Sequence, residues 1–361
     1  MDKKLPTNLK SNRKKIDQID SEILELLGKR SQLVINAGKI KEVAGDSSYY
    51  RPEREAQLIR NLINRNKSEI SQDGIKQIFK EIISACFVLE KNIKVFYLGP
   101  KGTFSELAVS KQFGNSVEKV NCPSIEDVFS KVEENENFYG IIPIENSTEG
   151  PVNLSLDCLM NSNLKICSEL EVPIKHCLLS KENNLDSIKL VYGHSQAIAQ
   201  CRNWIRKNLP NAKTTAVISS GKAAELSKTK KGVACIGHAT ISEIYKLKIL
   251  KKNIEDQKNN VTRFLVIGDL EPEKSGIDKT SIILKLKNKQ GILFKILKEF
   301  DKNKVNLTNI LSRPVKNNKW QYSFFLEFNG HKSEKKIERL LSNLTKLSEK
   351  VDILGSYPNS S

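Results

Sequence analysis

The chain has 361 residues, of which 39% are hydrophobic and 28% are charged. At about 150 residues per domain, this length predicts two or three domains, each large enough to bury a core of its own. No apolar run approaches the ~18 residues that a bilayer span requires, and residues 1–10 lack the apolar segment of a signal peptide. These features exclude a disulfide-stapled miniprotein and a membrane-embedded chain, and they favour a cytoplasmic protein.

The formal net charge of +17 raises the question of nucleic-acid binding. The excess is spread along the chain: +4 over 1–90, +5 over 91–270 and +8 over 271–361. The basic residues form no compact stripe with interleaved aromatic residues, so we expect no nucleic-acid partner. A diffuse positive field suits small anionic substrates equally well.

The seven cysteines are scattered without a CxxC pair, and none of the four histidines lies at ligand spacing from another. An odd number of scattered cysteines is typical of reduced thiols in a cytoplasmic protein. We therefore expect neither a metal site nor a cofactor.

Helical periodicity dominates the first part of the chain. Apolar residues recur every three or four positions over about 7–43, and this pattern predicts one long helix, followed by shorter helices over about 52–66 and 73–91. Three helices of such unequal length cannot bury the apolar stripe of the first among themselves. We therefore expect intertwined helices in a homodimer, with a homotetramer left open.

The periodicity becomes strand-like at Lys94, and short apolar strands then alternate with helices to about residue 270. This pattern predicts two lobes of α/β type, like those of periplasmic binding proteins, with the ligand site in the cleft between them. A charged segment with Pro and Gly at 271–276 precedes a β-α-β-β-α-β order, which is ferredoxin-like and of α+β class. The predicted domains are residues 1–92, 93–270 and 277–361.

Several cations of the first domain fall on the long helix. Arg30 and Lys41 are about 20° apart on one face, whereas Arg13 lies about 100° away, at 100° per residue. One site can therefore take Arg30 and Lys41 from one chain and Arg13 from its partner. Further polar candidates on the two shorter helices are Arg54, Glu55, Cys86 and Glu90. Any one of the charged residues alone is more simply explained as solvated surface charge.

As a set, these residues resemble the all-helical chorismate mutases. The resemblance lies in Arg13 with IDQID at 16–20, LGKR at 27–30, GKIK at 38–41, YRPERE at 50–55 and IISAC at 82–86. It implies that chorismate is rearranged to prephenate by holding a folded dicarboxylate with a cation at its ether oxygen.

The same resemblance implies a role for each residue. Arg13 and Arg30 hold carboxylates, and Lys41 meets the ether oxygen. Glu55 takes the substrate hydroxyl, and Arg54 supports the site. Glu90 stands where some relatives carry Gln, so it either donates a hydrogen bond to the ether oxygen when protonated or pairs with a nearby Lys or Arg.

Four segments of the middle domain carry Gly, hydroxyl and amide side chains at strand ends, which suits the binding of an anion. They are LGPKGTFS at 98–105, IPIENSTEG at 142–150, HSQAIAQC at 194–201 and NVTRF at 260–264. Turn chemistry alone also explains any one of them. All four in this order resemble prephenate dehydratase over about 94–268. That reaction removes the ring carboxylate as CO2 and the 4-hydroxyl as water.

By this resemblance Thr262 is the catalytic hydroxyl that bonds to the departing group. Arg263 is expected to bind a carboxylate or to brace the cleft, and Glu145 is an acid only if burial raises its pKa. Residues expected to orient the substrate are Ser105, Asn146, Thr148 and Gln200. The chain departs from the family where Gly193-His194-Ser195 stands in place of Ser-His-Pro.

The last domain resembles the amino-acid-binding ACT domain. Two segments carry the resemblance: Gly291-Ile292-Leu293-Phe294 at a helix start, and Leu311-Ser312-Arg313-Pro314 after a strand. A helix that starts with Gly offers free amides to an amino-acid carboxylate. The resemblance implies that phenylalanine is a feedback effector. We expect its affinity to be weakened, because Leu311 replaces the usual Glu. The alternative is an ACT fold that serves mainly for dimerisation.

Together the three domains predict a bifunctional enzyme of phenylalanine biosynthesis that acts on chorismate and prephenate. Two alternatives stay open. One is a dehydratase with a non-catalytic helical dimerisation domain, and the other is a two-lobed small-molecule sensor.

Overall fold

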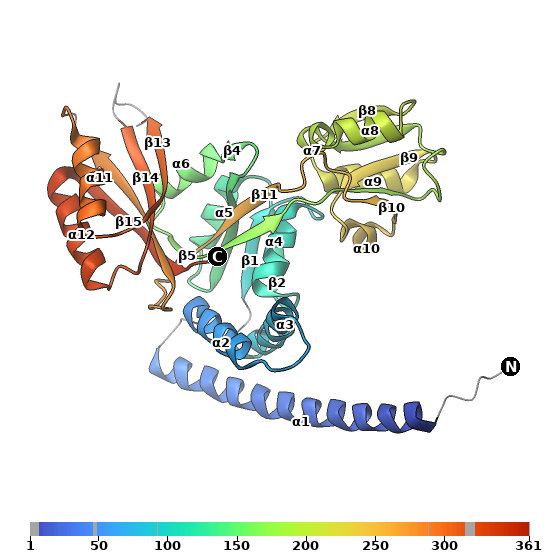
Figure 1. Ribbon diagram of the computed structural model, residues 1–361, viewed down its shortest axis with the longest axis horizontal. Coiled ribbons are helices and arrows are strands. Elements are labelled where there is room, and N and C mark those ends of the chain that lie inside the picture. The colour runs from blue at the N-terminus through green and yellow to red at the C-terminus, as the bar shows by residue number, and fades with distance from the viewer. Residues whose placement is uncertain (1–6, 46–48, 92, 288, 315–321, 361) are drawn as a thin grey trace.

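The computed structural model describes residues 7–45, 49–91, 93–287, 289–314 and 322–360. Figure 1 shows three regions: helices at the bottom, a two-lobed α/β region in the centre and on the right, and an α+β region on the left. The predicted fold class is therefore confirmed. Residues 1–6, 92 and 361, at the predicted domain boundaries, lie outside the described residues.

The first region consists of α1 (Thr7–Ala44), α2 (Pro52–Arg65) and α3 (Gln72–Glu90). Ser71 caps α3, because its side chain accepts a hydrogen bond from the Gly74 amide at 3.1 Å. Helix α1 extends well beyond the other two helices (Figure 1). Its apolar stripe stays exposed in the single chain: Ile16 is 55% and Leu24 is 71% exposed.

The first lobe is a sheet in the order β2-β1-β3-β11-β5, with β4 paired to β3. Its strands are β1 (Lys94–Leu98), β2 (Glu118–Cys122), β3 (Phe138–Asn146), β4 (Gly150–Pro151), β5 (Lys165–Pro173) and β11 (Val261–Gly268). Its helices are α4 (Phe104–Phe113), α5 (Ile125–Val132) and α6 (Asn153–Asn161). Strand β11 returns from the second lobe and lies antiparallel between β3 and β5.

The second lobe is a sheet in the order β10-β6-β9-β7-β8. Its strands are β6 (Cys177–Ser180), β7 (Leu190–His194), β8 (Lys213–Val217), β9 (Val233–Gly237) and β10 (Lys248–Lys252). Its helices are α7 (Ser195–Gln200), α8 (Arg202–Asn208), α9 (Ser220–Thr229) and α10 (Ile241–Tyr245). The two lobes approach closely at Gly221, where a Cβ atom would lie 2.1 Å from the Lys101 carbonyl oxygen. Only glycine allows this contact.

The C-terminal region follows the predicted β-α-β-β-α-β order. Its elements are β12 (Asp278–Leu286), α11 (Ile292–Lys302), β13 (Leu307–Pro314), β14 (Tyr322–Asn329), α12 (Lys335–Leu347) and β15 (Ser348–Pro358). The antiparallel sheet has the order β13-β14-β12-β15. One face packs on α11 and α12, and the other joins the core of the first lobe through Ile283, Phe325 and Tyr357.

The loop before α2 anchors the helical region to the first lobe, a contact that the sequence did not reveal. Tyr50 is 2% exposed, and its ring lies 4.8 Å from that of Phe113 and 5.1 Å from that of Tyr139. Its hydroxyl accepts a hydrogen bond from Gln112 at 2.8 Å. The side chain of Tyr50 thus belongs to the core of the first lobe.

All seven cysteines are free thiols, and Cys158 alone among them is only partly buried. Within the described ranges, no group of three or more His, Cys, Asp or Glu side chains is arranged to hold a metal ion. In the same part of the chain, no helix combines the length and the apolar character that crossing a membrane requires.

Candidate active sites

The structure joins Lys41 on α1 to Glu90 on α3. Lys41 Nζ lies 2.6 Å from Glu90 Oε1, and the glutamate side chain is 9% exposed. Gly38 allows the two helices to meet here, since a Cβ atom at this position would lie 2.8 Å from Glu90 Cγ. Of the two interpretations of Glu90, the structure shows the ion pair with a lysine.

Arg30 lies on the same helix and is half-buried. Its Nη1 atom is buried without a hydrogen-bond partner among the described residues. A buried guanidinium nitrogen without a partner is costly, and a bound carboxylate removes that cost. Cys86 lies on α3, four residues before Glu90, and is 7% exposed.

Arg13, Arg54 and Glu55 are not gathered around this ion pair within one chain. Arg13 is exposed on the far part of α1, about 26 Å along the helix from Arg30 at 1.5 Å per residue. Arg54 is exposed on α2. Glu55 instead lies 3.6 Å from Lys80 Nζ, and burial raises the pKa of its carboxyl group while lowering the pKa of the Lys80 ammonium. Lys80 is a partner that sequence reasoning missed.

In the second candidate site, Asn146 at the end of β3 holds Thr262 on β11. Asn146 Nδ2 donates to Thr262 Oγ1 at 2.8 Å and to Asn260 Oδ1 at 2.9 Å. Asn146 Oδ1 accepts from Thr148 Oγ1 at 2.6 Å. Because Thr262 Oγ1 accepts here, its own hydrogen stays available for a substrate. The role of Asn260 was not predicted.

Gln200 on α7 connects the second lobe to the loop after Asn146. Its Nε2 donates to Glu149 Oε1 at 3.1 Å, and its Oε1 lies 2.9 Å from His176 Nε2. Because an amide oxygen only accepts, Nε2 of His176 carries the hydrogen here, and burial lowers the pKa of this ring. The amide of Gln200 is therefore oriented from both sides. At Gly193 a Cβ atom would lie 3.0 Å from Ile198 Cγ1, so the missing side chain leaves room for α7.

Phe104 at the start of α4 lies between two buried histidines of the other lobe. Its ring centroid is 5.6 Å from that of His176 and 5.2 Å from that of His238. Ser105 follows it and is 7% exposed. This aromatic contact closes the two lobes on each other beside Ser105.

Burial of His238 predicts acid sensitivity. Burial lowers its pKa from 6.5 to about 4, so the unfolded chain binds one more proton than the folded chain between these pH values. Folding stability is therefore lost as the pH falls through this window, by on the order of 3 kcal/mol from this group. We expect His238→Gln to reduce the fall in the urea midpoint between pH 6.5 and pH 4, relative to the native chain. The matched control is His194→Gln, at a partly exposed histidine, which should show the same fall in urea midpoint as the native chain. An equal fall in His238→Gln and in the native chain would contradict the prediction.

Arg263 and Glu145 do not face Thr262. Successive residues of a strand point to opposite faces of the sheet, so Arg263 points toward the C-terminal region. Its two Nη atoms lie 2.9 and 2.6 Å from the carboxylate oxygens of Glu327, and Glu145 Oε2 lies 3.4 Å from Nη2. Arg263 therefore pairs with Glu145 and with Glu327 on the face opposite Thr262, and the expected contacts of Arg263 and Glu145 with the substrate stay a prediction. Bracing, the other role expected of Arg263, fits its position.

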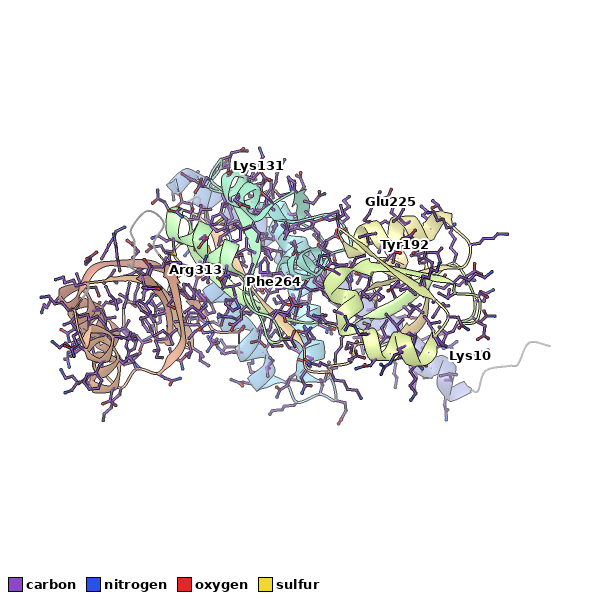
Figure 2. All side chains as sticks on the ribbon, turned by 90° about the horizontal axis from the view of Figure 1, so that it is seen from above. Lys10, Lys131, Tyr192, Glu225, Phe264 and Arg313 are labelled. Carbon is purple, nitrogen blue, oxygen red and sulfur yellow. The ribbon has the colours of Figure 1, made fainter. Side chains whose placement is uncertain are left out.

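The predicted regulatory residues divide between two faces of the C-terminal sheet. Gly291 starts α11 with φ 73°, and Ile292 and Leu293 pack into the core beneath the helices. Leu311 packs instead against the cluster shared with the first lobe, and Arg313 Nη2 lies 2.6 Å from Asp157 on α6. Figure 2 shows Arg313 where the C-terminal sheet meets that lobe. Within one chain, Leu311 and the Gly291 helix start therefore lie on opposite faces of the sheet, and Ser312 is exposed on an edge strand.

Three family models match successive parts of the chain. Chorismate mutase type II matches residues 12–91, prephenate dehydratase matches 95–272 and the ACT domain matches 280–345. Among solved structures, the prephenate dehydratase from Arthrobacter aurescens in complex with L-Phe is similar, with a TM-score of 0.69 and 31% identity. The match covers 74% of this chain and 90% of that chain.

Curated relatives match over nearly the full length. A bifunctional chorismate mutase/prephenate dehydratase from Aquifex aeolicus is 41% identical, covering 97% of this chain and 98% of the relative. One from Neisseria gonorrhoeae is 39% identical, covering 96% of each. Because all three regions match in the same order and at this identity, the chain belongs to the family of bifunctional chorismate mutases/prephenate dehydratases.

Proposed function

We propose that the helical region rearranges chorismate to prephenate and that the cleft of the α/β region converts prephenate to phenylpyruvate. Family membership supports both activities. The observation that carries the assignment of residues is the Asn146–Thr262 hydrogen bond, which leaves a donor free in the cleft. We propose residues 1–92, 93–270 and 277–361 as the units that carry the two activities and their regulation.

The rearrangement needs no nucleophile, only a held geometry and a cation where negative charge develops. In our proposal the unpartnered Nη1 of Arg30 binds a substrate carboxylate. Lys41 leaves Glu90 to meet the ether oxygen as the bond breaks. Arg13, from the exposed end of a partner's α1, supplies the second carboxylate contact.

The dehydration needs help for a departing hydroxyl group. The carboxylate leaves as CO2 and its electron pair enters the ring, while the C–OH bond breaks at the opposite ring carbon. Thr262, held by Asn146, donates a hydrogen bond to the departing oxygen and stabilises its developing charge. Gln200 and Ser105 lie where the two lobes meet, and we expect them to orient the substrate.

We propose that the chain works as a homodimer or larger homo-oligomer in the cytoplasm. The exposed apolar stripe of α1 supports a second copy, and seven free cysteines favour a reducing compartment. Phenylalanine is the proposed effector of the C-terminal region, supported by the ACT match. Because its candidate residues lie on two faces, we propose that a second copy completes the effector site along edge strand β13.

One incubation tests the two activities separately. Purified protein is given chorismate in one reaction and prephenate in another, and prephenate and phenylpyruvate are followed in each. The proposal expects prephenate and then phenylpyruvate from chorismate. Phenylpyruvate from supplied prephenate but none from chorismate would support the non-catalytic helical domain, and no turnover of either would support the sensor.

Mixing two inactive variants tests the shared mutase site. If Arg13 and Arg30 of one site come from different chains, then exchanging subunits between Arg13→Ala and Arg30→Ala should restore mutase activity. One site of each heterodimer then carries both lesions and the other carries neither. Rescue should reach about half of the native activity per heterodimer, measured as prephenate formation after subunit exchange. Verified exchange without rescue would exclude this arrangement.

The ion pair of Glu90 predicts the effect of Glu90→Gln on the mutase. The Glu90 carboxylate holds Lys41 by its charge and only accepts hydrogen bonds, whereas a Gln amide carries no charge and also donates. Mutase kcat/KM of Glu90→Gln at neutral pH should therefore exceed the native value, measured as prephenate formation from chorismate. Equal values for the native chain and Glu90→Gln would show that Glu90 has no contact with the reacting atoms.

A further inference from the structure

Arg263 directly follows Thr262 on β11 but points to the opposite face of the sheet, where the C-terminal region packs. Its guanidinium binds Glu327 of β14 through two parallel contacts, Nη1 to Oε1 at 2.9 Å and Nη2 to Oε2 at 2.6 Å. The side chain of Glu327 is 1% exposed and that of Arg263 is 12% exposed. A buried bidentate pair of this kind fixes geometry as well as charge.

Arg263 also has partners within its own lobe. Glu169 on β5 lies 3.1 Å from Nη1, and Glu145 lies 3.4 Å from Nη2. Lys279 on β12 neutralises part of this acidic cluster, because its Nζ lies 2.7 Å from Glu169. Loss of the charge at Glu327 alone therefore leaves Arg263 paired, and does not strand a buried cation.

A β-bulge lies immediately beside the pair. The register of β11 against β3 shifts between Arg263 and Phe264, one residue beyond Thr262. Bulges next to active sites re-aim the neighbouring side chains. Beside this bulge, Thr262 is bonded to Asn146 on one face of the sheet, and Arg263 is bonded to Glu327 on the other. Figure 2 shows Phe264 inside the first lobe.

Strand β13 contacts the same cluster and also helix α6. Asn309 Nδ2 donates to Glu327 Oε2 at 3.2 Å, and lies 3.5 Å from Glu145 Oε2. Four residues further along β13, Arg313 binds Asp157 at 2.6 Å. The segment from Glu145 to Asp157, which carries Asn146, is thus contacted by β13 at both ends.

We propose that Arg263 is a positioning residue through which the C-terminal region sets the geometry of Thr262. The bidentate contact with Glu327 holds the bulge in the form that aims Thr262 into the cleft. An effector that binds one arrangement of β13 and β14 better than another then changes the dehydratase rate through this contact. This inference rests on the proposed dehydratase function.

The test uses the full-length chain with Glu327→Gln, which keeps the shape of the side chain and removes its charge. Dehydratase kcat on prephenate should fall by about fivefold or more while KM changes by less than about twofold, because the transition state depends on the aim of Thr262. Mutase activity should be unaltered. The control is Glu299→Gln, which removes an ion-paired carboxylate of the same region, bound to Lys302 at 2.7 Å, and should change none of these values.

A second variant keeps every charge. Asn309→Ala removes only a neutral hydrogen bond to Glu327, so it should weaken inhibition by phenylalanine by about threefold or more and lower uninhibited kcat less than Glu327→Gln does. If Glu327→Gln does not fold, this variant decides.

The inference is overturned if folded Glu327→Gln keeps the native kcat, or if Glu299→Gln loses as much dehydratase activity as Glu327→Gln. If Glu327→Gln does not fold, the inference is overturned when phenylalanine still inhibits Asn309→Ala as strongly as the native chain. Absence of dehydratase activity in the native chain would instead refute the proposed function.

Discussion

Thr262→Ala should abolish most of the dehydratase activity and leave the mutase intact. Oγ1 of Thr262 lies 2.8 Å from Asn146 Nδ2 and accepts its hydrogen bond, so the hydroxyl hydrogen stays available for the substrate. Removing one donor that stabilises charge in a transition state lowers kcat by about 10²- to 10³-fold. KM should change much less, because the charge develops only as the hydroxyl departs. The measurement is phenylpyruvate formation from supplied prephenate over a range of concentrations.

Thr262→Ser is the matched control, since it keeps the hydroxyl and loses one methyl group. It should retain kcat within about tenfold of the native value. Native kcat in Thr262→Ala would show that Thr262 is not the catalytic hydroxyl. Equal losses in Ala and Ser variants would point to packing of the methyl group instead.

Arg30→Ala should remove mutase activity while sparing the dehydratase. A charge-assisted contact to a desolvated carboxylate is worth roughly 1.5 to 3 kcal/mol, and Arg30 can make two such contacts. Mutase kcat/KM should therefore fall by about 10²- to 10⁴-fold. Dehydratase activity should persist because Arg30 makes none of the contacts described between the helical region and the first lobe, which include those of Tyr50 and Ser84.

The neighbouring Lys29→Ala is the control for Arg30→Ala. Lys29 pairs with Glu25 at 2.6 Å on the exposed surface of the same helix, with its side chain 66% exposed. Its loss should leave both activities within about twofold of native. Parallel loss of both activities in folded Arg30→Ala would overturn the assignment of the mutase site.

Much of the fold was determined by local patterns in the sequence. The 3.6-residue apolar period predicted α1 as one helix ending near Val43, and the structure ends it at Ala44. The alternation of short strands and helices predicted the two lobes, and the β-α-β-β-α-β order predicted the C-terminal region. Such patterns can be detected in a sequence because helix and strand periods arise from the backbone geometry of adjacent residues. The quoted segments also brought Asn146 and Thr262 into one candidate site, which the structure joins by a hydrogen bond.

The tertiary structure alone decided which side chains face a site and which join two domains. Arg263 and Thr262 are adjacent in the sequence, yet the pleat of β11 turns one toward Glu327 and the other toward Asn146. Nothing local marks a partner 64 residues away, as Glu327 is from Arg263. Tyr50 likewise looks like a loop residue until the core of the first lobe encloses it. These contacts depend on long-range packing, which sets the environment of a side chain only after the elements have assembled.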